Sequence, residues 1–132
     1  MRSKIFSEQS TLRRMKLAPA PFELIKSGKK TVELRLYDEK RKKLRAGDII
    51  EFTNTHTGET LTTMVLKLHI FGNFEELYRT LPLLNCGYTE ENVACATPQD
   101  MEKYYSPEQQ KQYGVVGIEL CLSENGTENS DL

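Results

Sequence analysis

The stretch Ser27 to Leu36, "SGKKTVELRL", has the alternating pattern of a β-strand, but its polar positions carry charge. Because side chains alternate between the two faces of a strand, Thr31, Glu33 and Arg35 are expected on one face. A hydroxyl, a carboxylate and a guanidinium in a row suit either a solvated face with a weak ion pair or the floor of a binding site. The opposite face is expected to pack on the core and consists of Lys30, Val32, Leu34 and Leu36.

The segments around this strand carry further helix and strand signals. Residues 20–27 form a short helix in this interpretation, with Pro19 and Pro21 near its start and Gly28 at its end. Strands rich in β-branched and aliphatic residues are expected within 11–18 and at about 30–37, 48–54, 60–71 and 113–122. Helices are expected at 74–81 and after the Ser/Thr-Pro pairs at 97–98 and 106–107. This order predicts an α+β fold with a small, mainly antiparallel, barrel-like sheet flanked by short helices.

The length and composition are those of a single soluble domain. The chain has 132 residues, 38% hydrophobic and 28% charged, with a mean hydropathy of −0.54. It has no apolar run near the roughly 20 residues of a membrane helix and no secretory signal, so a cytoplasmic protein without a membrane partner is expected. The predicted domain covers 12–122, between a flexible N-terminus (1–11) and a disordered tail (123–132).

The sequence predicts neither a metal site nor a cofactor. Three cysteines and two widely separated histidines have no metal-ligand spacing. The glycine-rich phosphate-binding motifs and the G-x-S-x-G motif of α/β-hydrolases do not occur. These observations exclude the best-defined nucleotide-binding and hydrolase motifs.

Positive charge is concentrated in the N-terminal part of the chain. Residues 1–50 contain fourteen Lys and Arg against six Asp and Glu, whereas the remainder contains four against thirteen. The loop 38–45, "DEKRKKLR", places Lys40 and Arg41 beside the polar strand, where clustered bases favour a phosphate backbone. Two alternatives stay open: the two halves neutralise each other in the fold, or the loop is an ordinary solvated segment.

The stretch Gly28–Arg35, "GKKTVELR", matches the pattern G-x-K-x-x-E-x-R and resembles the signature of the ASCH domain family. The flanking "PFELIKSG", "LYDEKRKKLRAGDIIEF" and closing "YYSPEQQKQYGVVGIEL" agree, so the resemblance covers roughly residues 15–121. It implies a PUA-like fold, a small β-barrel flanked by helices. It also implies a cleft that binds RNA or a modified nucleoside, with Lys30, Glu33 and Arg35 as the functional positions.

Some proteins that this chain resembles are hydrolases. In one branch, the acetylcytidine amidohydrolases, a lysine, a threonine and a glutamate act together, and the lysine matches Lys30. The threonine falls at Glu33 in this chain, although Thr31 lies two residues earlier; Glu90 and Glu91 are candidates for the glutamate. Other relatives are ribonucleases. Catalytic roles for Lys30 and Glu33 are therefore expected only if the protein is a hydrolase.

The leading hypothesis is a module that binds RNA, a nucleoside or a nucleotide, with a hydrolase or a domain without such a ligand as alternatives. Strand alternation sends Lys30 away from Glu33 and Arg35, whereas a shared site needs all three. A bulge or bend just after Gly28 is expected to turn Lys30 inward. The expected ligand-binding residues are Lys30, Thr31, Glu33, Arg35, Lys40 and Arg41.

Overall fold

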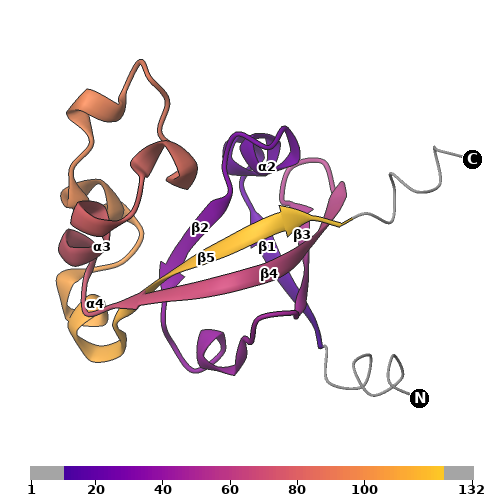
Figure 1. Cartoon of the computed structure of the whole chain (residues 1–132), viewed down its shortest axis with the longest axis horizontal. Coiled ribbons are helices and arrows are strands. Elements are labelled where there is room, and N and C mark those ends of the chain that lie inside the picture. Colours follow the sequence, from indigo (N-terminus) through magenta and orange to yellow (C-terminus); the bar gives the residue numbers. More distant parts are fainter. Residues whose placement is uncertain (1–10, 124–132) are drawn as a thin grey trace, which may run out of the picture.

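The computed structural model describes residues 11–123, which contain one five-stranded sheet that curls into a half-barrel (Figure 1). The strands run in the order β1-β3-β4-β5-β2; β1 and β3 are parallel and all other pairs are antiparallel. Residues 1–10 and 124–132, which make up most of the expected flexible terminus and tail, lie outside the described residues. The strands are β1 Leu12–Leu17, β2 Val32–Leu36, β3 Ile49–Asn54, β4 Thr60–Phe71 and β5 Val115–Leu122.

The helices lie mostly at one end of the sheet (Figure 1). Helix α2 connects β1 to β2 and lies at the top of Figure 1. Helices α3 and α4 and the 3-10 helices η2 to η4 group together at the left of the same view. The Ser106-Pro107 signal does start α4, where the Ser106 and Gln109 side chains cap each other's backbone N–H groups. The helical elements are α2 Pro19–Lys26, η1 Arg41–Lys43, α3 Phe74–Thr80, η2 Leu83–Cys86, η3 Val93–Cys95, η4 Pro98–Lys103 and α4 Pro107–Tyr113.

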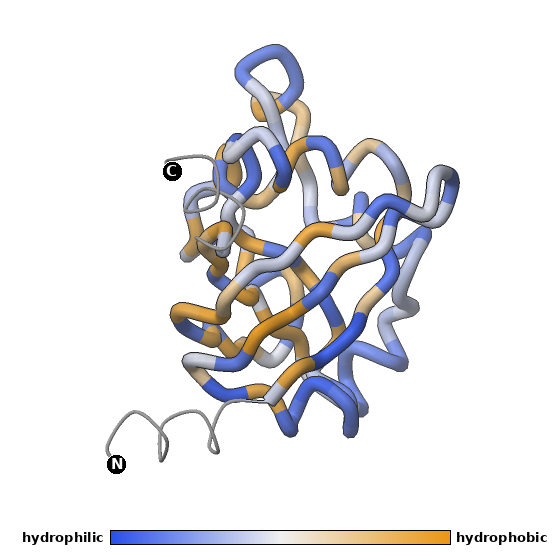
Figure 2. Tube along the Cα trace, turned by 90° about the vertical axis from the view of Figure 1, so that its right-hand side faces the viewer, coloured by the Kyte–Doolittle hydropathy of each residue, from blue (hydrophilic) through white to orange (hydrophobic). Residues whose placement is uncertain are grey.

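Two apolar clusters hold the sheet and helices together. The first fills the concave side of the half-barrel and includes the fully buried Phe22, Ile50 and Phe52. The second lies between β2 and α3 and includes Phe74 and Leu77, also fully buried. Burial of such side chains stabilises the fold by roughly 1.5–3 kcal/mol each. In Figure 2 the hydrophobic segments accordingly lie along the strands, with hydrophilic loops at the periphery.

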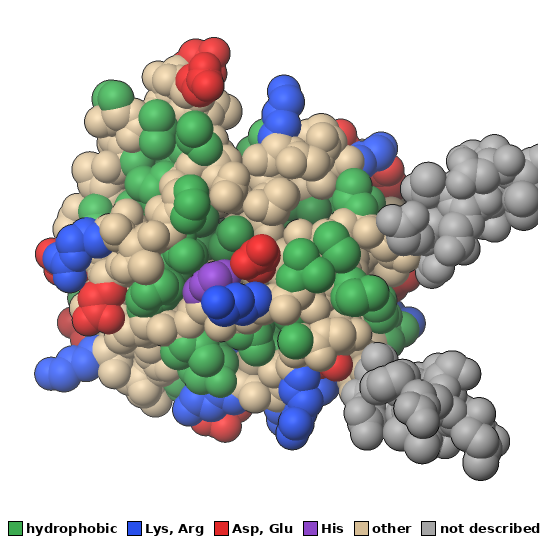
Figure 3. All heavy atoms as spheres, viewed as in Figure 1, with side chains coloured by type: hydrophobic (Ala, Val, Ile, Leu, Met, Phe, Trp, Pro, Cys, Tyr) green, Lys and Arg blue, Asp and Glu red, His purple; other side chains and the backbone are tan. Residues whose placement is uncertain are grey.

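The outer surface of β4 and β5 exposes several apolar side chains around a polar pair (Figure 3). His69 Nε2 lies 2.8 Å from Glu119 Oε1, with Lys67 opposite Glu119 in the sheet. Within residues 11–123 no helix is long and apolar enough to cross a membrane. The large exposed apolar side chains of these two strands are Met64, Leu66, Ile70 and Leu122.

The half-barrel is open between its two end strands, β1 and β2. These strands are the first and last of the sheet order and do not pair with each other. One side chain bridges the gap: Arg35 Nη2 on β2 donates to the backbone carbonyl of Lys16 on β1, at 2.8 Å. We call this gap the seam. The expected barrel is therefore an incompletely closed one, and the seam is where side chains of β1 and β2 face a cleft.

Candidate ligand-binding cleft

The chain bends sharply between α2 and β2, and the bend turns Lys30 inward. Gly28 adopts a φ of +83°, which favours glycine, and the carbonyl of Leu24 then accepts both the Lys29 and the Lys30 N–H at 3.0 Å. The expected strand at 30–37 is thus too long, since β2 begins only at Val32. Strand alternation does not apply to Lys30, and the expected bend after Gly28 is confirmed.

Lys30, Glu33 and Arg35 form one compact charge cluster at the seam. Lys30 Nζ lies 2.9 Å from Glu33 Oε1, and Arg35 Nε donates to Glu33 Oε2 at 2.7 Å. The three side chains are 11%, 6% and 14% exposed, respectively. The Lys30 contact is a close ion pair rather than an aligned hydrogen bond, because Oε1 has no hydrogen bond of good geometry. The fold therefore brings together three of the site residues expected from the sequence.

Glu33 stays ionised although it is buried. Burial alone raises the pKa of a carboxyl group, since it penalises the charged form. The positive charges of Lys30 and Arg35 and their short contacts with the carboxylate outweigh burial and hold the pKa of Glu33 below its usual value. With one anion between two cations, the cluster carries a net positive charge.

The cluster forms part of the lining of an open cleft of about 530 Å³. The walls come from β1, α2 and β2 on one side and from α3, η2, η4 and the loops around them on the other. The volume falls within the usual range of small-ligand sites. The polar and aromatic residues that line the cleft are Lys16, Lys30, Glu33, Arg35, Tyr78, Tyr88, Asp100, Lys103, Tyr104 and Tyr105.

One wall of the cleft is held in place by a chain of hydrogen bonds. The hydroxyls of Tyr78 and Tyr88 lie 2.7 Å apart, and Tyr88 donates to Asp100 Oδ2 at 2.6 Å. The hydrogen bond from Tyr88 is the main cause that lowers the pKa of Asp100, whereas burial raises the pKa of both Tyr78 and Tyr88. The wall is therefore made of neutral tyrosines anchored to a carboxylate.

Tyr104 differs from the other tyrosines because its side chain is exposed. It is 64% accessible at the cleft, and Lys103 Nζ lies 5.5 Å from its ring centroid. Its neighbour Tyr105 is partly buried and stacks on Phe74, with ring centroids 6.1 Å apart. An exposed ring beside a cation offers a surface on which a planar ligand can stack.

Gly87 lets the opposite wall approach Lys30 closely. It has a φ of +111°, and a Cβ at this position would lie 3.3 Å from Lys30 Cδ. The adjacent Cys86 is buried, and burial raises the pKa of its thiol to about 11. This cysteine is therefore a protonated, weakly reactive group of the wall rather than a nucleophile.

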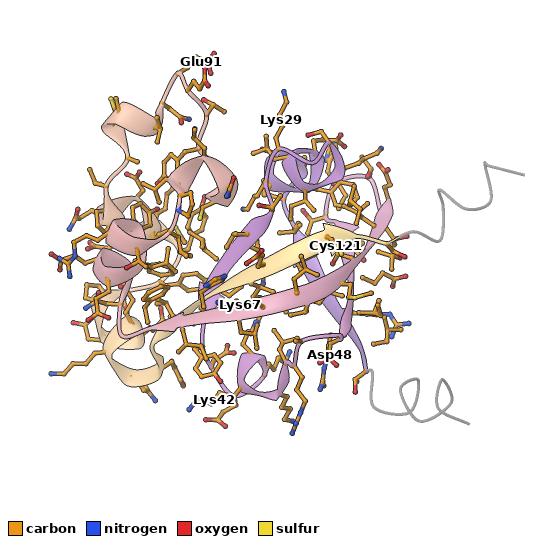
Figure 4. The ribbon with its side chains drawn as sticks, viewed as in Figure 1. Lys29, Lys42, Asp48, Lys67, Glu91 and Cys121 are labelled. Atoms are coloured by element: carbon orange, nitrogen blue, oxygen red, sulfur yellow. The ribbon has the colours of Figure 1, made fainter. Side chains whose placement is uncertain are left out.

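Three of the expected ligand-binding residues do not line the cleft. Thr31 lies before β2, where its backbone N–H donates to Asn85 and its carbonyl accepts from Leu120. Lys40 and Arg41 lie at η1, on the other side of Arg35, and line a different hollow. Glu90 and Glu91, the candidates for a catalytic glutamate, are exposed and do not line the cleft; Glu91 lies at the tip of a loop at the top of Figure 4.

The fold also brings to the cleft residues that no sequence pattern indicated. Tyr88, Asp100 and Tyr104 come from a segment of short 3-10 helices that has no regular hydrophobic period. The Thr97-Pro98 signal marked the start of η4, but not the side on which Asp100 would lie. Among residues 11–123, no group of three or more His, Cys, Asp or Glu side chains is arranged to hold a metal ion.

The sequence profile of the ASCH domain matches residues 15–123. The chain belongs to the ASCH domain family. A search of curated proteins found no match. Two solved structures share about a third of their residues with this ASCH domain. The hypothetical protein PH0355 is 33% identical, with a TM-score of 0.70 over 86% of this chain and 99% of its own. Protein PF0455 from Pyrococcus furiosus is 34% identical, with a TM-score of 0.67 over 86% and 98%.

More distant structures share the fold alone. A point mutant of ZmASCH from Zymomonas mobilis is 16% identical, with a TM-score of 0.59 over 83% of this chain and 68% of its own. The ASCH domain from Lactobacillus crispatus is 14% identical, with a TM-score of 0.56 over 92% and 93%. The curled sheet with its helices is therefore the ASCH/PUA-like α+β fold.

Proposed function

We propose that this ASCH domain binds RNA or a nucleoside, with a base in the cleft over Lys30, Glu33 and Arg35. The observation that carries the proposal is the combination of a cationic cluster with a tyrosine wall in one cleft of ligand size. The link between the ASCH family and RNA binding supports the same conclusion.

The two cations supply the hydrogen-bond donors. Arg35 uses Nε for Glu33 and Nη2 for Lys16, so Nη1 has no acceptor within residues 11–123. In the same part of the chain, Lys30 is paired only with Glu33 and keeps further N–H groups for a ligand. We expect these donors to contact acceptor atoms of a base, a sugar or a phosphate.

Glu33 has a positioning role in this proposal. Its contacts are complete without a ligand: one oxygen faces Lys30, the other faces Arg35, and the side chain is 6% exposed. A buried carboxylate between two cations fixes the direction of both, as a supporting residue does in a preorganised site. Glu33 is among the expected ligand-binding residues; we propose instead that it orients Lys30 and Arg35 for the ligand.

The hydrolase alternative has less support from the geometry. Lys30 Nζ is held in an ion pair with Glu33, 2.9 Å away, and the other carboxylate oxygen of Glu33 accepts from Arg35, so neither side chain is free to act on a substrate without leaving this cluster. Thr31, the nearest substitute for the threonine of the amidohydrolases, does not line the cleft. A turnover assay with acetylated cytidine and with short RNAs tests this alternative directly.

Binding of nucleosides and of short RNAs to paired lysine variants tests the proposed function. Lys30→Gln removes the positive charge at the cleft and replaces the ammonium group by a shorter, neutral amide, whereas Lys29→Gln makes the same change in an exposed side chain that points away from the protein (Figure 4). We expect at least about tenfold weaker binding for Lys30→Gln, corresponding to roughly 1.4 kcal/mol, and little change for Lys29→Gln. Equal affinities for the two variants would contradict the proposal, and turnover that depends on Lys30 would favour the hydrolase.

A further inference from the structure

A second hollow lies on the other side of Arg35 and is lined mostly by bases. It has a volume of about 730 Å³ and is formed by β1 and the segment around η1. Seven of its eleven lining residues are lysine or arginine, and none is acidic. We call this hollow the basic groove; its cationic residues are Arg13, Arg14, Lys16, Arg35, Lys40, Arg41 and Lys43.

The acids next to the basic groove neutralise only part of its charge. Four arginines have an acidic partner: Arg13 with Asp48, Arg14 with Glu51, Arg35 with Glu33 and Arg41 with Asp38. Within residues 11–123, the three lysines Lys16, Lys40 and Lys43 have no ion pair. All three are exposed. The groove therefore keeps a net positive charge that faces solvent.

Two of the paired arginines also have unused hydrogen-bonding capacity. The Nε atoms of Arg13 and Arg41 are buried and have no hydrogen-bond acceptor within the described residues. Such donors are rare in folded proteins, because a buried N–H without an acceptor costs about 1–3 kcal/mol. The groove is therefore lined by two guanidinium groups whose hydrogen bonding is incomplete within the described residues.

The basic groove and the cleft adjoin each other at the seam. Lys16 and Arg35 line both hollows, and the hydrogen bond from Arg35 Nη2 to the Lys16 carbonyl lies between them. A ligand that extends beyond the cleft across this bond enters the groove. The cleft has a wall of tyrosines and, at its floor, the hydrogen-bond donors of Lys30 and Arg35, whereas the groove offers positive charge over a larger volume.

We propose that the basic groove binds backbone phosphates of a single nucleic-acid strand, one nucleotide of which places its base in the cleft. This proposal rests on the proposed function and makes the ligand a strand rather than a free nucleoside. Regularly spaced phosphates match a row of cations, and a base reaches an enclosed cleft only when it is unpaired. RNA and DNA strands share this backbone chemistry, so the test includes both.

The test compares a double variant of the groove with a matched control. Lys40→Gln with Lys43→Gln removes two exposed charges that line the groove but not the cleft. Lys67→Gln with Lys111→Gln removes two exposed charges that line neither hollow. The probes are a nucleoside and single strands of RNA and of DNA of increasing length, each titrated at several salt concentrations.

We expect the groove variant to bind strands more weakly than wild type and control, and to bind the nucleoside as well as they do. The slope of log affinity against log salt is expected to fall by about 1.4 for two lost phosphate contacts. RNA bound more tightly than DNA of the same sequence would place a 2′-hydroxyl in contact with the protein; equal affinities would leave the backbone phosphates as the recognised groups.

Two results would overturn the basic-groove proposal: strands that bind no more tightly than the nucleoside, or a groove variant that behaves like the control. Failure of the proposed function gives a different result, because Lys30→Gln would then leave nucleoside binding unchanged. Thermal unfolding of all variants checks that the fold is intact; we expect no change, since the four lysines are exposed.

Discussion

Arg35 joins the two end strands of the half-barrel: its Nη2 donates to the carbonyl of Lys16 at 2.8 Å, while its Nε donates to Glu33 at 2.7 Å. The same guanidinium thus bridges the seam, orients the buried carboxylate and separates the cleft from the basic groove. A side chain with these contacts couples the stability of the fold to the geometry of the site.

Arg35→Lys is expected to lower the free energy of unfolding by about 2 kcal/mol. A lysine can still pair with Glu33, but it lacks the planar fork that reaches Lys16 at the same time. Urea denaturation measures the loss. Arg79→Lys is the control, because Arg79 is an exposed partner of Glu75 and the same substitution there should cost less than about 0.5 kcal/mol. Equal losses of free energy of unfolding in both variants would contradict the bridging role of Arg35.

Glu33→Gln is expected to destabilise the protein by about 3–5 kcal/mol near neutral pH, since it leaves Lys30 and Arg35 without their shared counter-charge. The pKa of Glu33 is lower in the folded than in the unfolded chain. Its ionisation therefore stabilises the fold above the unfolded pKa, and this contribution is lost as the pH falls through the folded pKa.

The difference in free energy of unfolding between wild type and Glu33→Gln should accordingly narrow when the pH is lowered from about 7 to about 3. Urea denaturation at a series of pH values measures it, with Glu75→Gln as an exposed control. A difference that stays constant across this range would show that the Glu33 carboxylate is not preferentially ionised in the fold.

Tyr104→Ala is expected to weaken binding of a base-containing ligand by about tenfold, and Tyr104→Phe to retain most of the affinity. Stacking of a base on an aromatic ring contributes roughly 1–3 kcal/mol, and both tyrosine and phenylalanine supply the ring. Because Tyr104 is 64% exposed, neither variant should change stability appreciably. If Tyr104→Phe binds as weakly as Tyr104→Ala, the hydroxyl rather than stacking matters.

Gly87→Ala is expected to impair both stability and binding. The φ of +111° disfavours a side chain, and the added Cβ would press on Lys30 Cδ at 3.3 Å. We expect a loss of about 1–2 kcal/mol in stability and weaker ligand binding. Gly58→Ala is the matched control: its φ is +80°, but nothing lies within 4 Å of the added Cβ, so only stability should fall. Normal ligand binding by Gly87→Ala would contradict the role of this close approach.

Much of the fold could be predicted from local patterns. The β-like runs at 48–54 and 60–71 and the helix signals at 20–27 and 74–81 correspond to elements of the structure, because each buries a face with the expected period. The helix predicted after Thr97-Pro98 is instead the 3-10 helix η4. The pairing of β1 with β3 is parallel, and no local pattern indicates which distant strand another strand will join.

The site was predictable where its residues lie close together in the sequence. The stretch Gly28–Arg35 contains the whole charge cluster, and the turn at Gly28 explains why Lys30 joins it. Tyr88, Asp100 and Tyr104 could not be assigned, since long-range packing of η2 and η4 brings them to the cleft. The basic groove is a similar case: Arg13 Nη2 donates to the Lys43 carbonyl, thirty positions away, through the arrangement of β1 beside η1.

Chemical-shift mapping with a short single-stranded RNA tests the central claim most directly. If the ligand binds over Lys30, Glu33 and Arg35, the largest amide shifts will fall within 30–35, at 87–88 and within 100–105, the segments that line the cleft. Two results would contradict it: amide shifts confined to the outer surface of β4 and β5, or no shifts at RNA concentrations up to about 1 mM. A dissociation constant of about 1 mM corresponds to a binding free energy of roughly −4 kcal/mol.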